Sequence, residues 1–334
     1  NITSTDDKQM DMIYASAGTI IINSGSFTSG TPKWTLNIND SAYKAGTANI
    51  IVNGGTFKGY DPRNAENEGK GTSLVADGVG IDKNADGTFT AKSGMVAQIL
   101  DADGNSVAAY ATLAEAIAAA NAGETVKLLA DVTADVVINK NITLDLGGKT
   151  LTNTGAGKAT ISVTGGTVTV KNGTVIGGTS YYNIEVTKGS NANLTLEDVT
   201  ATAGNTGSSM IDNWGTMTIK SGTYTGGLNV VKSEEGSTLV INGGKFTLEY
   251  ATSGYTGVIF AYGTTTITGG EFIQNLTTTG RWNHPQVILA GVVEGYTSSV
   301  TVTGGKFTNK MSGESIFRGV GKATSDNFEV SGGT

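Results

Sequence analysis

The sequence contains no cysteine, three prolines, one histidine and three arginines among its 334 residues. The missing cysteines exclude disulfide bridges and thiolate metal sites. Because the net charge is −7 and arginine is rare, no basic surface could neutralise phosphates, so we expect no nucleic-acid partner. No apolar run approaches the ~18 residues that a membrane span needs, so we expect no membrane span in this segment.

Glycine is abundant instead, with 49 copies, and many of them mark an internal repeat. Each copy is a short apolar–polar–apolar strand, then a small polar residue, glycine, one further residue and an aromatic ring. The copies lie at residues 20–27, 50–57, 168–175, 194–201, 217–224, 239–246, 265–272, 300–307 and 328–334. Between Gly222 and Gly333 the repeated glycines are 22 to 35 residues apart, a period that indicates a solenoid or a similar repeat array.

Alignment of the copies predicts which side chains point inward. Successive strand residues face opposite sides, so an aliphatic column belongs to the core and its threonine-rich neighbour to the surface. The aliphatic column is Val170, Leu196, Ile219, Ile241, Ile267, Val302 and Val330. The neighbouring column is Thr169, Thr195, Thr218, Val240, Thr266, Thr301 and Glu329. A second core column is Val175, Tyr224, Phe246, Phe272 and Phe307.

This repeat resembles that of the right-handed parallel β-helix, the pectin-lyase-like architecture. The resemblance covers most of the chain and implies an all-β solenoid, whose coils bury their inner faces against one another. It says little about function, because this fold hosts lyases, hydrolases, adhesins and phage tailspikes alike.

The repeat is interrupted between about residues 58 and 140. Residues 77–90 and 96–110 read as hairpins that turn at Asp-Gly pairs. Thr112 and Glu115 form a capping box, which predicts a helix over residues 112–121. Such a helix would cover the open end of a solenoid. We therefore predict two stacked segments with this short helix between their regular coils. Residues 1–92 would be the C-terminal coils and cap of a first β-helix, and 93–334 a second β-helix with an N-terminal hairpin and capping helix.

Three strings at residues 112–116, 122–131 and 144–151 resemble the opening of tandem β-helix domains in large surface proteins of gut-type bacteria and of their phages. The resemblance implies an extracellular, cell-surface or virion location and a segment of a longer protein. It implies surface glycans or proteins as partners, and a trimer if the chain is like a phage tailspike.

The sequence shows no catalytic cluster, metal site or cofactor motif, so we expect none of these. Its carboxylates are dispersed, and Asp101–Asn105 resembles a calcium loop only faintly because the distal glutamate is missing. The single histidine, His284, lies in Asn-His-Pro and not in the Gly-His-Gly of polygalacturonases.

Six residues in irregular segments are candidates for ligand binding. Flat rings beside hydrogen-bond donors suit sugar recognition, and loops of successive coils can gather on one side of a solenoid. The candidates are Arg281, Trp282, His284, Trp214, Tyr181 and Tyr182. These aromatic side chains could equally pack on the solenoid flank. We therefore expect a non-catalytic, extracellular structural or adhesive β-helix segment of a larger surface or phage-associated protein, which binds glycans through its loops. The alternative function is a polysaccharide lyase or glycoside hydrolase, including a phage depolymerase, whose carboxylates pair only in three dimensions.

Overall fold

The computed structural model describes residues 1–5, 8, 10–251, 254–278, 280, 283–324 and 327–334. They form a nearly all-β solenoid of parallel stacked coils, with about 12 turns and two short α-helices, which confirms the predicted fold class. Two compact units comprise Asn1–Ala130 and Asp131–Thr334. The predicted boundary near residue 92, which would separate a first β-helix from a second, stays a prediction.

The first unit begins with parallel strand pairs that carry the N-terminal copies of the repeat. The strands are β1 (Ile2–Thr3), β2 (Ile13–Ala15), β3 (Gly18–Ile22), β4 (Ser26–Thr28), β5 (Leu36–Ile38), β6 (Ala48–Val52) and β7 (Gly55–Lys58). β3 pairs with β6, β2 with β5, and β4 with both β1 and β7. The ring of Phe27 stacks on that of Phe57 with centroids 4.9 Å apart, as equivalent positions of successive coils should.

The first unit also contains a short helix that the sequence did not reveal. α1 (Asp40–Lys44) follows β5 directly, and a 3₁₀ turn (Pro32–Trp34) precedes that strand. Asn39 caps α1, because its side-chain oxygen accepts a hydrogen bond from the backbone N–H of Ala42 at 3.0 Å. Asn39 therefore lies between the end of β5 and the start of α1, and the hydrophobic pattern of the sequence does not indicate this change from strand to helix.

Antiparallel strands complete the first unit, and both predicted hairpins are confirmed. They are β8 (Val79–Lys83) with β9 (Thr88–Ser93), and β10 (Ala97–Leu100) with β11 (Ser106–Tyr110), followed by β12 (Thr125–Leu128). The predicted helix is α2 (Leu113–Ala119). The backbone N–H of Glu115 donates a hydrogen bond to the hydroxyl of Thr112, which caps this helix. Leu113, Ala116 and Ile117 are its buried face.

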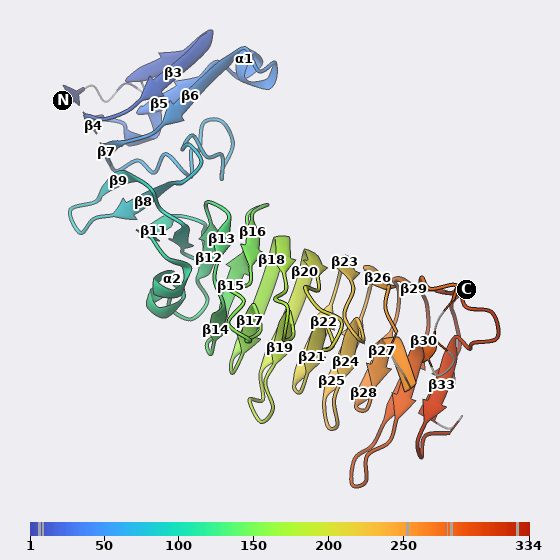
Figure 1. The fold of residues 1–334 in the computed structure, drawn as a ribbon. Coiled ribbons are helices and arrows are strands. Elements are labelled where there is room, and N and C mark those ends of the chain that lie inside the picture. The colour runs from blue at the N-terminus through green and yellow to red at the C-terminus, as the bar shows by residue number, and fades with distance from the viewer. Residues whose placement is uncertain (6–7, 9, 252–253, 279, 281–282, 325–326) are drawn as a thin grey trace. The chain divides into compact units, whose positions relative to one another are not determined.

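The second unit is a regular β-helix whose strands lie side by side from green to red in Figure 1. One series of parallel strands is β15 (Ile142–Asp145), β18 (Thr167–Ile176), β20 (Asn193–Thr202), β22 (Thr216–Ile219), β25 (Thr238–Ile241), β28 (Thr264–Ile267), β31 (Ser299–Val302) and β34 (Phe328–Val330). The next series is β13 (Val132–Thr133), β16 (Thr150–Thr152), the second halves of β18 and β20, β23 (Gly222–Thr225), β26 (Lys245–Leu248), β29 (Glu271–Gln274) and β32 (Lys306–Asn309).

A separate sheet forms the third side of the coils. Its strands, in spatial order, are β14 (Val136–Ile138), β17 (Ile161–Val163), β19 (Ile184–Val186), β21 (Ile211–Asn213), β24 (Val231–Ser233), β27 (Gly254–Ala261), β30 (Asn283–Gly291) and β33 (Phe317–Val320). We call it the third sheet. The sequence repeat does not mark it, because its strands lie outside the repeated glycine string.

The predicted register is confirmed. Val170, Leu196, Ile219, Ile241, Ile267 and Val302 pair in consecutive coils and are fully buried. Val330 continues the column but is 49% exposed, because it lies on the last strand of the sheet. The threonine-rich column lies in register one residue earlier, and its members are partly exposed.

The aromatic column forms a ladder of parallel rings in the core. Ring centroids are 4.9 Å apart from Tyr224 to Phe246, 5.0 Å from there to Phe272 and 5.0 Å to Phe307. This spacing is close to the distance between hydrogen-bonded strands, so the coil repeat itself sets the stacking. The chain turns tightly before each ring, which is why the repeat has glycine at that position. Gly270, for example, has φ of +107°, and a Cβ there would meet the backbone oxygen of Gly244 at 3.1 Å.

One inward position breaks the apolar pattern and yields a stability prediction. Thr265 is fully buried between Leu239 and Val300, and its hydroxyl has no hydrogen-bond partner among the described residues. Thr265→Val keeps the shape and removes this unsatisfied group, so we expect the free energy of unfolding to rise by about 1 kcal/mol. Thermal denaturation monitored by circular dichroism measures it, with the partly exposed Thr266→Val as control. An unchanged or lowered melting temperature for Thr265→Val would contradict the expected gain.

Candidate functional site

The third sheet carries a row of mostly charged side chains. Parallel pairing places one residue of each coil beside the equivalent residue of the next. The row consists of Glu185, Asp212, Lys232, Phe260, Leu289 and Arg318, of which Asp212 and Leu289 are buried. Three of the predicted ligand residues are linked to this row. Trp214 is hydrogen-bonded to Asp212, and the charge of Asp212 acts on Tyr182. His284 contacts Glu314, which also pairs with Arg318.

Trp214 follows β21 directly, and two polar groups hold its indole. Its Nε1–H donates a hydrogen bond of 2.8 Å to Oδ2 of Asp212. The ammonium of Lys188 lies 4.1 Å from the ring centroid, within the range of a cation–π contact, and is 3.4 Å from a carboxylate oxygen of Glu235. A sugar that stacks on Trp214 would therefore use the other face of the indole or displace Lys188.

Asp212 belongs to a buried pair of carboxyl groups. Asp212 is 1% exposed and Glu234 is 4% exposed, and Lys232 contacts Glu234 at 2.5 Å. Burial raises the pKa of the Asp212 carboxyl to about 7, and the charge of Glu234 and a hydrogen bond with it act in the same direction. Lys232 and Trp214 oppose the rise. Oδ1 of Asp212 has no donor among the described residues, so a proton held between the two acids would satisfy it.

Tyr181 and Tyr182 precede β19 and pack against each other with ring centroids 4.7 Å apart. Burial raises the pKa of Tyr182 to about 12, and Asp212 is the largest of the neighbouring charges that add to the rise. Tyr182 and Trp214 are therefore both influenced by Asp212, Tyr182 through the charge of the carboxyl group and Trp214 through a hydrogen bond. Tyr181 is the more open ring, with 38% of its surface exposed.

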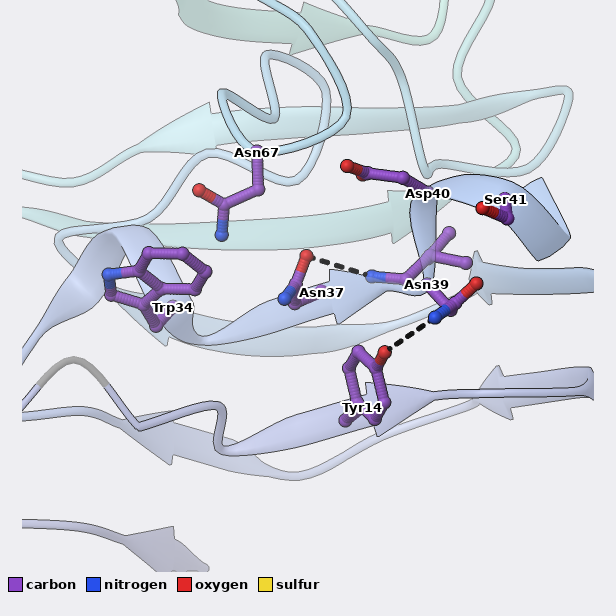
Figure 2. A pocket seen from close by; sticks show the side chains of 8 residues that line it. Tyr14, Trp34, Asn37, Asn39, Asp40, Ser41 and Asn67 are labelled. Carbon is purple, nitrogen blue, oxygen red and sulfur yellow. Dashed lines mark hydrogen bonds between the residues drawn. The ribbon is translucent and has the colours of Figure 1, made fainter. Parts of the chain in front are cut away.

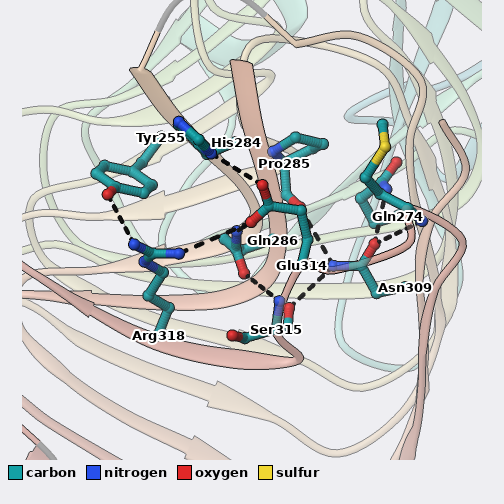
Figure 3. A network of polar contacts seen from close by, with 10 residues as sticks. Tyr255, Gln274, His284, Pro285, Gln286, Asn309, Glu314, Ser315 and Arg318 are labelled. Atoms are coloured by element: carbon teal, nitrogen blue, oxygen red, sulfur yellow. Dashed lines mark hydrogen bonds and ion pairs between the residues drawn. The ribbon is translucent and has the colours of Figure 1, made fainter. Parts of the chain in front are cut away.

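His284 lies in a second network, on β30 and its neighbours (Figure 3). Its Nδ1 is 2.8 Å from Oε1 of Glu314, and its ring lies 5.3 Å from that of Tyr255, its partner in the parallel register. The guanidinium of Arg318 lies 4.6 Å from the Tyr255 ring and donates to the Tyr255 hydroxyl at 2.9 Å. Gln286 donates to the other carboxylate oxygen of Glu314. This network presents an aromatic face, a guanidinium and an imidazole together.

The six candidates thus have three different outcomes. Trp214 is hydrogen-bonded to Asp212, whose charge also acts on Tyr182, and Tyr181 packs against Tyr182, whereas His284 joins Tyr255, Glu314 and Arg318. Arg281 and Trp282 lie outside the described residues. Sequence reasoning missed the partners in both networks, because they belong to third-sheet strands and to the segments beside them, which no glycine pair marks. Alignment of those strands would have paired Tyr255 with His284.

The described residues contain no group of three or more His, Asp or Glu side chains arranged to hold a metal ion. The Asp101–Asn105 segment is a hairpin turn. Oδ1 of Asp101 accepts hydrogen bonds from the backbone N–H groups of Asp103 and Asn105. In the part of the chain that the structure describes, the helices are too short to cross a membrane.

Comparison of the chain with protein-family models, with curated proteins and with solved structures finds no match in any of the three. The assignment of a parallel solenoid therefore rests on the strand pairing in the structure. The pectin-lyase-like and surface-protein resemblances stand on the sequence strings alone.

Proposed function

We propose that this chain is a non-catalytic, extracellular β-helix segment of a larger bacterial surface or phage-associated protein, and that it binds surface glycans through the outward side of the third sheet. The proposal is supported by a rigid ladder that holds aromatic rings and charged donors in fixed order. Protein loops that recognise sugars combine these two kinds of group.

The network around His284 is the observation that carries the proposal. Its charged groups are well placed to bind hydroxyls, and they are not shielded from solvent. The side chains of His284 and Arg318 are 36% and 38% exposed, and Tyr255 is 39% exposed. Glu314 is only 14% exposed and holds the imidazole of His284 and the guanidinium of Arg318 in place, so the arrangement is organised before any ligand arrives.

The proposal predicts which variants lose binding. Tyr255→Ala removes the exposed ring beside His284 and the contact with Arg318, so we expect glycan affinity to fall at least tenfold, about 1.4 kcal/mol. A glycan array identifies the ligand, and calorimetry then measures the dissociation constant. Thr301→Ala, on a different side of the coil, is the control and should bind as the unmodified protein does. Full binding by the Tyr255 variant, or no binding by any form, would contradict this site.

A polysaccharide-processing enzyme is the second candidate, and the acid pair of Asp212 and Glu234 favours it. A carboxyl group with a pKa near 7 is suited to general acid catalysis at neutral pH. The 1% exposure of Asp212 argues against it, because a catalytic acid must reach the glycosidic oxygen. Release of reducing ends from a polysaccharide by the unmodified protein, abolished in Asp212→Asn, would establish the enzyme and overturn the non-catalytic proposal.

A further inference from the structure

The first unit contains a polar pocket that no candidate from the sequence includes. Its cavity volume is about 420 Å³, within the range of pockets that hold small ligands. Figure 2 shows its walls, which include Tyr14, Trp34, Asn37, Asn39, Asp40 and Asn67. They come from β2, the 3₁₀ turn, β5, the start of α1 and the segment after β7. All of them lie within one compact unit.

Internal hydrogen bonds fix the three amide side chains. Nδ2 of Asn39 donates to the Tyr14 hydroxyl at 3.1 Å, while its oxygen caps α1. Nδ2 of Asn67 donates to the backbone oxygen of Lys33 at 2.9 Å, and Nδ2 of Asn37 donates to Asp11 at 2.9 Å. The amides are thus oriented without a ligand, and in Figure 2 those of Asn37 and Asn67 turn toward the same space beside Trp34. A pre-organised polar wall loses little entropy on binding.

Hydrogen-bonding capacity remains on this wall. The Tyr14 hydroxyl accepts from Asn39 and keeps its own O–H for another acceptor. The structure gives no hydrogen-bond partner within the described residues to the amide oxygen of Asn67 or to the carboxylate of Asp40. These donors and acceptors surround a half-buried indole ring. A flat apolar face bordered by such groups matches a sugar ring, which has apolar C–H faces and a polar rim.

The surrounding charge sets the class of sugar. Asp40 lines the pocket, Asp11 holds Asn37, and Glu68 accepts from the backbone N–H of Ile38, a lining residue, at 2.8 Å. Burial raises the pKa of the Glu68 carboxyl, and the charges of Asp40 and Asp11 add to the rise, whereas backbone hydrogen bonds oppose it. Asp40 and Asp11 therefore supply the negative charge, and their two carboxylates outweigh the ammonium of Lys33, which lies 5.8 Å from the Trp34 ring. A carboxylate or sulfate on the ligand would meet net repulsion here.

From this geometry we infer that the pocket of Tyr14, Trp34, Asn37, Asn39, Asp40 and Asn67 binds an uncharged saccharide unit, stacked on Trp34 and hydrogen-bonded by the amides. This site is independent of the third-sheet networks of the second unit. Its ligand is defined by chemistry: neutral hexose residues in preference to uronic acids.

The test uses the full chain and calorimetric titration with neutral tetrasaccharides of glucose, galactose and mannose, and with tetragalacturonic acid. We expect at least one neutral tetrasaccharide to bind, and Trp34→Ala to weaken it tenfold or more. Asn67→Ala, in an irregular segment away from the strands, should weaken it several-fold with an unchanged melting temperature. Asp40→Asn should improve binding of tetragalacturonic acid.

Tyr255→Ala separates this site from the one proposed above, because binding of a neutral tetrasaccharide that persists in this variant and is lost in Trp34→Ala belongs to the pocket. If Tyr255→Ala abolishes all binding while Trp34→Ala and Asn67→Ala bind normally, the pocket is not a saccharide site although the third sheet is. Tighter binding of tetragalacturonic acid, or no binding of any neutral tetrasaccharide, would also overturn the inference.

Discussion

Ile267→Asp is expected to unfold the second unit or render the protein insoluble, whereas Thr266→Asp should leave it folded. Ile267 is fully buried in the aliphatic column, between Ile241 and Val302 of the neighbouring coils. The substitution removes a buried side chain and places an unpaired carboxylate among apolar groups. The two effects together should cost at least about 5 kcal/mol. That is comparable with the whole stability of a typical domain.

The neighbouring position supplies the control for this experiment. Thr266 precedes Ile267 on the same strand but is partly exposed, and it pairs with Val240 and Thr301 on the outer face. A carboxylate there stays hydrated, so we expect a change within about 0.5 kcal/mol. Soluble yield and thermal denaturation by circular dichroism compare the two variants. Equal melting temperatures would show that the inward and outward faces of this strand are wrongly assigned.

Asp212→Asn is expected to remove a pH dependence of stability. The Asp212 carboxyl has a pKa of about 7 in the folded protein and 3.8 without the fold, so the folded state binds its proton more tightly. This contribution is fully present below pH 3.8 and is lost as the pH rises to about 7. Since one pKa unit equals about 1.4 kcal/mol, the loss between about pH 5 and pH 8 should be about 2–3 kcal/mol. The asparagine variant carries no ionisable group there and should lack the loss.

Urea denaturation at several pH values between about 5 and 8 gives the unfolding free energies that this prediction needs. The asparagine should be the more stable form at the alkaline end, because its amide can still accept from Trp214 and does not repel Glu234. Glu197→Gln is a matched control, since Glu197 is an exposed carboxylate paired with Lys220 in the same unit. If the wild type and Asp212→Asn keep a constant difference in stability across this series, Asp212 does not titrate in this range.

Both experiments depend on the burial of a side chain. The burial of Ile267 can be predicted from the sequence, whereas that of Asp212 cannot. The periodicity alone places Ile267 inward, because a strand alternates and a glycine pair marks its end. Nothing in the sequence distinguishes Asp212 from the other aspartates. Asp212 lies on β21, which pairs with β24, and both are short strands between irregular segments. A side chain on such a strand acquires most of its neighbours from the coils on either side, as Asp212 does from Lys232 and Glu234.

The parallel coils, the two core columns and the helix that begins after Thr112 can all be predicted from the amino-acid sequence. These features follow from local rules: alternation along a strand, tight corners that favour glycine, and a capping box. The partners on the third sheet and the pocket beside Trp34 follow only from the folded chain. Those sites join residues that are distant in the sequence, such as Tyr14 with Asn39, 25 positions apart, and Tyr255 with Arg318, 63 positions apart. Their contacts depend on the length of each intervening segment, which no repeat fixes.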